Sequence, residues 1–157
     1  MEKILLIFGN DILIASLSAW IIAQLLKVII TLVIERKFSL ERLFGDGGMP
    51  SGHSATVMAL ATTVGWMLGY DSPVFAIALV LAIIVMHDAC GVRRETGKQA
   101  ESIKELADAI NSLVREQDLK VRTEKLKALV GHTPLQVFFG AILGIAVAAL
   151  YIFIRLI

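Results

Sequence analysis

Residues 11–35 read DILIASLSAWIIAQLLKVIITLVIE, an apolar run that carries one charge, Lys27, between its two ends. A hydrocarbon core about 30 Å thick needs about 20 mostly apolar helical residues to cross it, and this run is long enough. Further apolar blocks occupy residues 51–70, 73–90 and 134–157. We therefore predict an all-α integral membrane bundle of about four transmembrane helices.

The composition of the whole chain agrees with a membrane protein. Of its 157 residues, 57% are hydrophobic and the mean hydropathy is +0.76, whereas soluble domains are about 45–50% apolar. The formal net charge is only +1, and no dense basic tract is present, which argues against nucleic-acid binding. The single cysteine excludes an intramolecular disulfide and a cysteine-rich metal site.

The placement of lysine and arginine predicts the orientation of the bundle. Residues 36–53 hold three of these cations and residues 91–132 hold nine, whereas the link between the second and third blocks holds none. Positive charge marks the cytoplasmic side of a membrane protein. We therefore expect a multi-pass protein of the cell (inner) membrane, with both long loops in the cytoplasm and both termini outside.

We treat residues 1–157 as one membrane domain with an insertion at about 98–130. The insertion is charged and amphipathic, which predicts one helix, or two with a break near residues 117–118, lying on the membrane surface. A ligand-binding domain is the less favoured alternative. The apolar positions of the insertion share one helical face: Ile103, Leu106, Ile110 and Leu113.

Small residues recur every fourth position on the last block, at Gly140, Gly144 and Ala148. This spacing predicts close helix packing, either within the chain or between chains. Four spans are few to enclose a lipid headgroup, so a homodimer is expected.

A glycine-rich turn leads into the second block, and it carries the first of three polar clusters. Glycines allow a ligand close to the backbone, and a helix start offers unpaired N–H groups to an anion. His53 falls in the first turn, where it can donate a proton to a phosphate or a leaving group. A plain helix start, capped by Ser51 or Ser54, is the alternative interpretation. The turn comprises Gly47, Gly48, Met49, Pro50, Ser51, Gly52 and His53.

The second cluster follows the third block and contains Asp88, Arg93 and Arg94. Arginine matches the geometry of phosphate oxygens, although cations flanking a membrane span need no further role. Asp88 opposes the dipole at a helix C-terminus and therefore needs a cationic partner, for which Arg93, Arg94 and Lys27 are candidates. Lys27 itself lies about two turns inside its span, where it is either functional or extends to the surface.

The third cluster precedes the last block. Thr133 and Gln136 have the spacing of a capping box, with Pro134 at the first helical position. The box explains both residues without any function, but it does not explain His132. If the cytoplasmic ends of the blocks meet, then His132 and His53 both begin helices at one face.

The three clusters together resemble a known superfamily. Residues 48–53 resemble the Pro-Ser-Gly-His motif of the type 2 phosphatidic acid phosphatase and vanadium haloperoxidase superfamily. Residues 88–100, with Asp88, Gly91, Arg93 and Arg94, and residues 131–133 are similar to its divergent branch of small bacterial membrane proteins. The resemblance covers most of the chain.

The resemblance implies a phosphohydrolase that needs no metal or other cofactor. The phosphate-binding residues would be Lys27, Ser51, Gly52, Arg93 and Arg94. The acid would be His53, and the nucleophile that forms a phosphohistidine would be His132. The implied substrate is a phosphomonoester or pyrophosphate of a lipid, either a phospholipid or an isoprenoid phosphate, at the cytoplasmic leaflet.

The chain departs from the usual motifs at three places. Position 34 is isoleucine where an arginine is usual, and Arg94 precedes His132 by much more than the usual six residues. The usual third motif has an acid four residues after the histidine, where this chain has Gln136. Asp88 is the candidate replacement. A non-catalytic protein that binds or transports anionic lipids is therefore the second hypothesis, and a structural subunit that holds a partner is the third.

Overall fold

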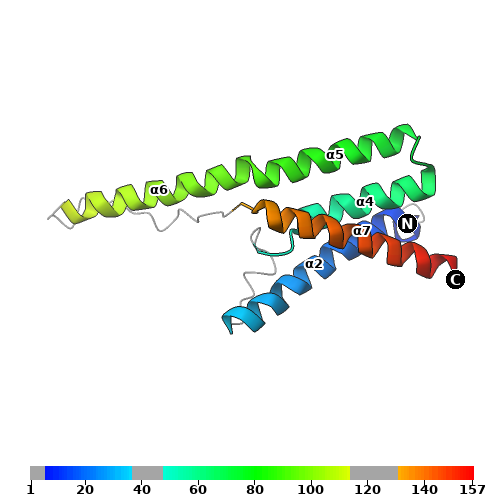
Figure 1. Ribbon diagram of the computed structural model, residues 1–157, viewed down its shortest axis with the longest axis horizontal. Coiled ribbons are helices and arrows are strands. Elements are labelled where there is room, and N and C mark those ends of the chain that lie inside the picture. Colours follow the sequence, from blue (N-terminus) through cyan, green and yellow to red (C-terminus); the bar gives the residue numbers. More distant parts are fainter. Residues whose placement is uncertain (1–5, 37–47, 114–130) are drawn as a thin grey trace.

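The computed structural model describes residues 6–36, 48–113 and 131–157. These residues form helices joined by short turns and contain no strand. A short 3-10 turn, η1, is followed by five α-helices (Figure 1). Their bounds are η1 Leu6–Gly9, α2 Asp11–Glu35, α4 Gly52–Leu68, α5 Pro73–Cys90, α6 Val92–Leu113 and α7 Pro134–Leu156.

Three of the described helical runs are long and apolar enough to cross a membrane: Asp11–Val33, Pro73–Ser112 and Pro134–Leu156. The fourth predicted span corresponds to α4, whose 17 residues rise about 25 Å. That length is at the short limit for a hydrocarbon core about 30 Å thick. The predicted all-α membrane bundle is confirmed. Helix α4 is the shortest of the described α-helices, and its crossing of the membrane stays a prediction.

Polar residues begin the four bundle helices. Each accepts, through its side-chain oxygen, the backbone N–H of the third residue of its helix, which satisfies one of the unpaired donors of the first turn. The capping residues are Asn10, Ser51, Ser72 and Thr133. The structure thus decides between the two candidate caps of α4 in favour of Ser51, and it confirms the predicted capping box between Thr133 and Gln136.

Helix α4 is the centre of the bundle and packs against α7, α2 and α5. Its core contacts are made by small side chains, which allow the helix backbones to approach closely. Ala55 and Ala59 of α4 are fully buried, in a cluster with Ala19 and Ala23 of α2 and Ala148 of α7. Small residues therefore bring three helices close together in this core.

The glycines of α7 face α4. A Cβ atom placed on Gly140 would lie 2.9 Å from Ser54 Cβ, and one on Gly144 would lie 3.0 Å from Ala55 Cα. In both cases a backbone carbonyl oxygen, that of Ser51 or that of Ala55, lies closer still, so a side chain at either position would force the two helices apart. The repeat at Gly140, Gly144 and Ala148 is therefore a seam within the chain, which resolves the alternative left open above.

The amphipathic segment begins at Val92 instead of residue 98. The reason lies at Gly91, whose N–H donates to His87 O at 2.9 Å, while Glu95 N–H donates to Gly91 O at 3.0 Å. Helical hydrogen bonding therefore continues on both sides of the glycine. As a result, α6 extends the line of α5 beyond the bundle (Figure 1).

The apolar face predicted for this segment is present on α6. Ile103, Leu106 and Ile110 are all exposed, as expected for a face that lies against another surface. The remainder of the segment, residues 114–130 with the predicted break, lies outside the described residues. Its place on the membrane surface stays a prediction.

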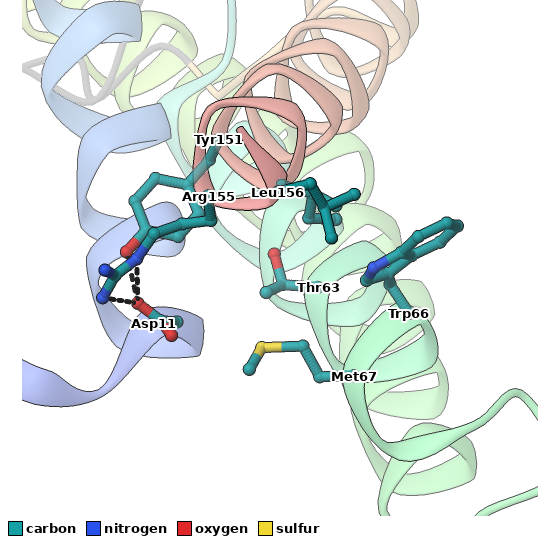
Figure 2. A pocket seen from close by; sticks show the side chains of 8 residues that line it. Asp11, Thr63, Trp66, Met67, Tyr151, Arg155 and Leu156 are labelled. Carbon is teal, nitrogen blue, oxygen red and sulfur yellow. Dashed lines mark hydrogen bonds and ion pairs between the residues drawn. The ribbon is translucent and has the colours of Figure 1, made fainter.

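A polar cluster joins the start of α2 to the end of α7. Asp11 Oδ1 accepts from Tyr151 Oη at 2.6 Å, from Arg155 Nε at 2.9 Å and from Arg155 Nη2 at 2.5 Å (Figure 2). Because η1 and the last turn of α7 lie at the same end of the bundle, this cluster joins α2 to α7 at the end opposite to the predicted site.

Candidate functional site

The three clusters predicted from the sequence come together at one end of the bundle. They lie at the start of α4, the end of α5 and the start of α7. Two backbone hydrogen bonds join these helix ends: Ser51 N–H donates to Gln136 O at 3.0 Å, and His132 N–H donates to Ala89 O at 3.1 Å. The convergence that the sequence suggested is therefore present in the backbone itself.

The two histidines of the motifs are neighbours, although 78 residues separate them in the chain. His53 is the second residue of α4, and His132 precedes the cap of α7. Their ring centroids are 6.1 Å apart with an angle of 64° between the planes. His132 is 1% exposed, whereas His53 is half-buried. One imidazole is thus held inside the bundle, and the other, beside it, is partly exposed.

Gln136 contacts His132 through its side chain. Its Oε1 lies 3.2 Å from His132 Nδ1 and accepts the Thr133 N–H at 3.0 Å. The residue four positions after the histidine therefore occupies the place that the usual acid would occupy, with an amide oxygen instead of a carboxylate.

Lys27 is buried in the bundle, with only 4% of its surface exposed. It therefore does not extend to the surface, which decides against that alternative. A Cβ on Gly48 would lie 3.8 Å from both Cγ and Cδ of Lys27, so the backbone of the glycine turn passes over the lysine stem. Gly48 has a φ of 95°, a conformation that glycine adopts without strain.

Gln24 and Trp20 continue the same face of α2 towards Gly52. A Cβ on Gly52 would lie 3.4 Å from Trp20 Cδ1 and 3.6 Å from Gln24 Oε1. Gln24 is buried, with 8% of its surface exposed. Neither Gln24 nor Trp20 is predicted from the sequence motifs. Gln24 nevertheless lies three residues before Lys27, a spacing that places both on one helix face and that is visible in the sequence.

The local electrostatics favour an anion. The starts of α4 and α7 meet at this end, and each helix start carries unpaired N–H groups and the positive end of its dipole. Ser51 caps α4 through its buried hydroxyl. The stem of the buried Lys27 lies beside Gly48, in the turn that leads into this helix start. A phosphate oxygen suits this arrangement of donors.

The remaining predicted residues belong to α5 and α6. Asp88 is half-buried in the last turn of α5, directly before Ala89, whose carbonyl holds the backbone of His132. Arg93 and Arg94 lie in the first turn of α6. Their backbone follows the end of α5, at the same end of the bundle as the two histidines. The structure does not describe their side chains.

No group of three His, Cys, Asp or Glu residues in the described ranges is arranged to hold a metal ion. A pocket of about 130 Å³ lies elsewhere, at the opposite end of the bundle (Figure 2). It is lined by the Asp11, Tyr151 and Arg155 cluster and by apolar side chains of α4 and α7, and none of the predicted site residues contributes to it.

Comparison with known proteins shows the family of this chain. The sequence matches the model of the Divergent PAP2 family over residues 8–147. It is also 44% identical over 142 residues to the "Uncharacterized membrane protein YuiD" of Bacillus subtilis (strain 168), an alignment that covers 87% of this chain and 90% of that protein. No solved structure matches the chain. Because the family match covers most of the sequence, including all three clusters, the chain belongs to the divergent PAP2 family.

Proposed function

We propose that the protein is a membrane phosphatase or phosphotransferase that acts on a lipid phosphate through a phosphohistidine. The observation that carries the proposal is the pairing of His53 and His132, with ring centroids 6.1 Å apart at two adjoining helix starts. A buried lysine, whose stem lies beside Gly48 in the turn that leads into α4, adds positive charge, which favours a phosphate. Membership of the divergent PAP2 family supports the same chemistry.

In the proposed reaction the phosphate is held by Lys27, by the Ser51–Gly52 turn and by Arg93 or Arg94. A ring nitrogen of His132 attacks phosphorus and forms a P–N bond, while the P–O bond to the leaving alcohol breaks. His53 gives its proton to that leaving oxygen. Water then attacks phosphorus, His53 takes the proton of the water, and the P–N bond breaks to release phosphate. In a phosphotransferase, an acceptor hydroxyl replaces the water.

A lipid is the proposed substrate because the site lies at the end of a membrane bundle. The helices that carry it are covered with exposed apolar side chains, among them Leu25 and Ile29 of α2, which flank the buried Lys27 along the helix. A phosphate attached to an acyl or isoprenoid chain reaches such a site from the bilayer. The placement of lysine and arginine supports a site at the cytoplasmic leaflet.

The proposal is tested by phosphate release from lipid phosphates in detergent micelles. We expect activity in the wild type and its loss in His132→Ala, because the nucleophile is then absent. His53→Ala should slow formation of the phosphohistidine, because the leaving oxygen then departs without a proton. His87→Ala is the matched control, since His87 is exposed on α5 and has no role in the proposed reaction. Equal activity of the wild type and His132→Ala would refute the nucleophile assignment.

A second function, binding of anionic lipids without turnover, is favoured by one observation. Gln136 contacts His132 with a neutral amide oxygen, which supplies no charge to stabilise an imidazolium. Under this hypothesis lipid phosphates bind equally well to the wild type and to His132→Ala, and no phosphate is released by either. Phosphate release that depends on His132 rules it out.

A further inference from the structure

One amide oxygen serves two groups at the start of α7. Gln136 Oε1 accepts the backbone N–H of Thr133 at 3.0 Å and lies 3.2 Å from Nδ1 of His132. The first contact completes the capping box of the helix, and the second reaches the imidazole. The cap of α7 and the orientation of His132 therefore depend on the same atom.

The backbone N–H of Thr133 identifies that atom. A backbone N–H only donates, so the side-chain atom that faces it must be the amide oxygen of Gln136 and not its nitrogen. The same oxygen then faces Nδ1 of His132, which must carry the hydrogen to make a bond. In the neutral ring the lone pair consequently lies on Nε2.

We propose that Gln136 is a positioning residue that holds His132 as the Nδ1–H tautomer and so makes Nε2 the nucleophilic atom. This inference rests on the proposed function for its catalytic meaning. The acceptor is neutral, so it orients the ring without favouring the imidazolium as a carboxylate would. The ring therefore stays unprotonated, and nucleophilic, to a lower pH than an acid at position 136 would allow.

The backbone of Gln136 extends the effect to the phosphate turn. Its carbonyl accepts the Ser51 N–H at 3.0 Å, and Ser51 caps α4 beside Gly52 and His53. One residue thus ties the nucleophile, through its side chain, to the proposed phosphate-binding helix start, through its backbone. A side-chain substitution at position 136 removes the first link and leaves the second.

The tautomer is measured by NMR of the full chain in detergent micelles, with ¹⁵N-labelled histidine. The chain has three histidines, so His→Ala variants assign each ring. At a pH where the ring is neutral, His132 should show a protonated Nδ1 and an unprotonated Nε2. In Gln136→Leu this preference should be lost, while the signals of His87 stay unchanged. A wild-type His132 that is protonated at Nε2, or that is unaffected by Gln136→Leu, overturns the inference.

Two further variants separate orientation from stability of the helix start. Thr133→Ala removes the hydroxyl of the cap but keeps the backbone N–H that fixes Gln136, so the tautomer of His132 should not change. Gln136→Glu keeps both acceptor contacts and adds charge, so the midpoint for protonation of His132 should move to higher pH. The other titratable residues at this end, which are the same in every variant compared, include Lys27, His53, His87, Asp88, Cys90, Arg93, Arg94 and Glu95.

Kinetics then connect the tautomer with catalysis. If phosphate release is observed, Gln136→Leu should lower kcat by about tenfold, the effect of one hydrogen bond of ordinary strength, and change KM little. An inactive protein whose His132 has the Nδ1–H tautomer refutes the proposed function and leaves the positioning role of Gln136 intact. An active protein in which Gln136→Leu changes neither tautomer nor kcat refutes the positioning role alone.

Discussion

Replacing Gly140 by alanine tests how the seam between α4 and α7 supports the site. The new Cβ would lie 2.9 Å from Ser54 Cβ and 3.1 Å from Ser51 Cβ, whereas ordinary contacts begin at 3.4 Å. The nearest atom is the backbone carbonyl oxygen of Ser51, which lies closer still and cannot turn away. The starts of the two helices must therefore separate by at least about 0.5 Å, and such a gap forfeits about a quarter to a half of the dispersion energy across the seam. Overpacking of this kind costs about 1–3 kcal/mol.

Two opposing terms decide the net effect of Gly140→Ala. Alanine is a better helix former than glycine by about 1 kcal/mol, which offsets part of the overpacking cost. We expect a net loss of about 0–2 kcal/mol in the free energy of unfolding, together with weaker phosphate binding, since the displaced atoms belong to Ser51 and Ser54. Denaturant titration in micelles measures the first, and calorimetry with inorganic phosphate measures the second.

Two other glycines provide matched controls. Gly144→Ala meets Ala55 Cα at 3.0 Å, one turn further from the site, so it should destabilise the bundle without a comparable loss of phosphate binding. Gly9→Ala meets nothing within 4 Å and should leave both quantities near wild type. A Gly140→Ala protein that is more stable than the wild type and binds phosphate equally well would refute the close packing described for this seam.

Three further substitutions test other parts of the account. Lys27→Met keeps an unbranched stem against Gly48 but removes the charge, so phosphate binding measured by calorimetry should fall at least tenfold; unchanged binding would exclude Lys27 from the site. Ser51→Ala removes the cap of α4 and should cost about 1 kcal/mol of stability in denaturant titration, and no loss would contradict the capping geometry. Tyr151→Phe removes one hydrogen bond to Asp11 at the far end of the bundle, so a small fall in thermal stability with full phosphate binding is expected, and impaired binding would contradict the separation of the two ends.

The sequence predicted the helices well because their signals are local. Length and apolar composition define α2, α5 and α7, and polar residues at their starts mark where they begin. The capping box at Thr133 and Gln136 follows from spacing alone. The convergence of His53 and His132 was also predictable, since positive-charge placement puts both helix starts at one membrane face.

Other features depend on packing between distant segments and leave little trace in the sequence. The spacing of Gly140 and Gly144 is equally compatible with contacts inside one chain and between two chains. The continuation of α5 into α6 depends on the backbone conformation at Gly91, although glycine is a residue that often ends a helix. The contact of Gln136 with His132 depends on the ring orientation, which a capping motif does not specify.

The central claim is that His132 carries the phosphoryl group during turnover. The direct measurement is to mix the protein with a ³²P-labelled lipid phosphate, quench it rapidly in alkali and map the labelled peptide by mass spectrometry. We expect an acid-labile, alkali-stable label on His132. This label should be absent from His132→Ala and retained in His87→Ala. Phosphate release without label on His132, or label that persists in His132→Ala, would contradict it.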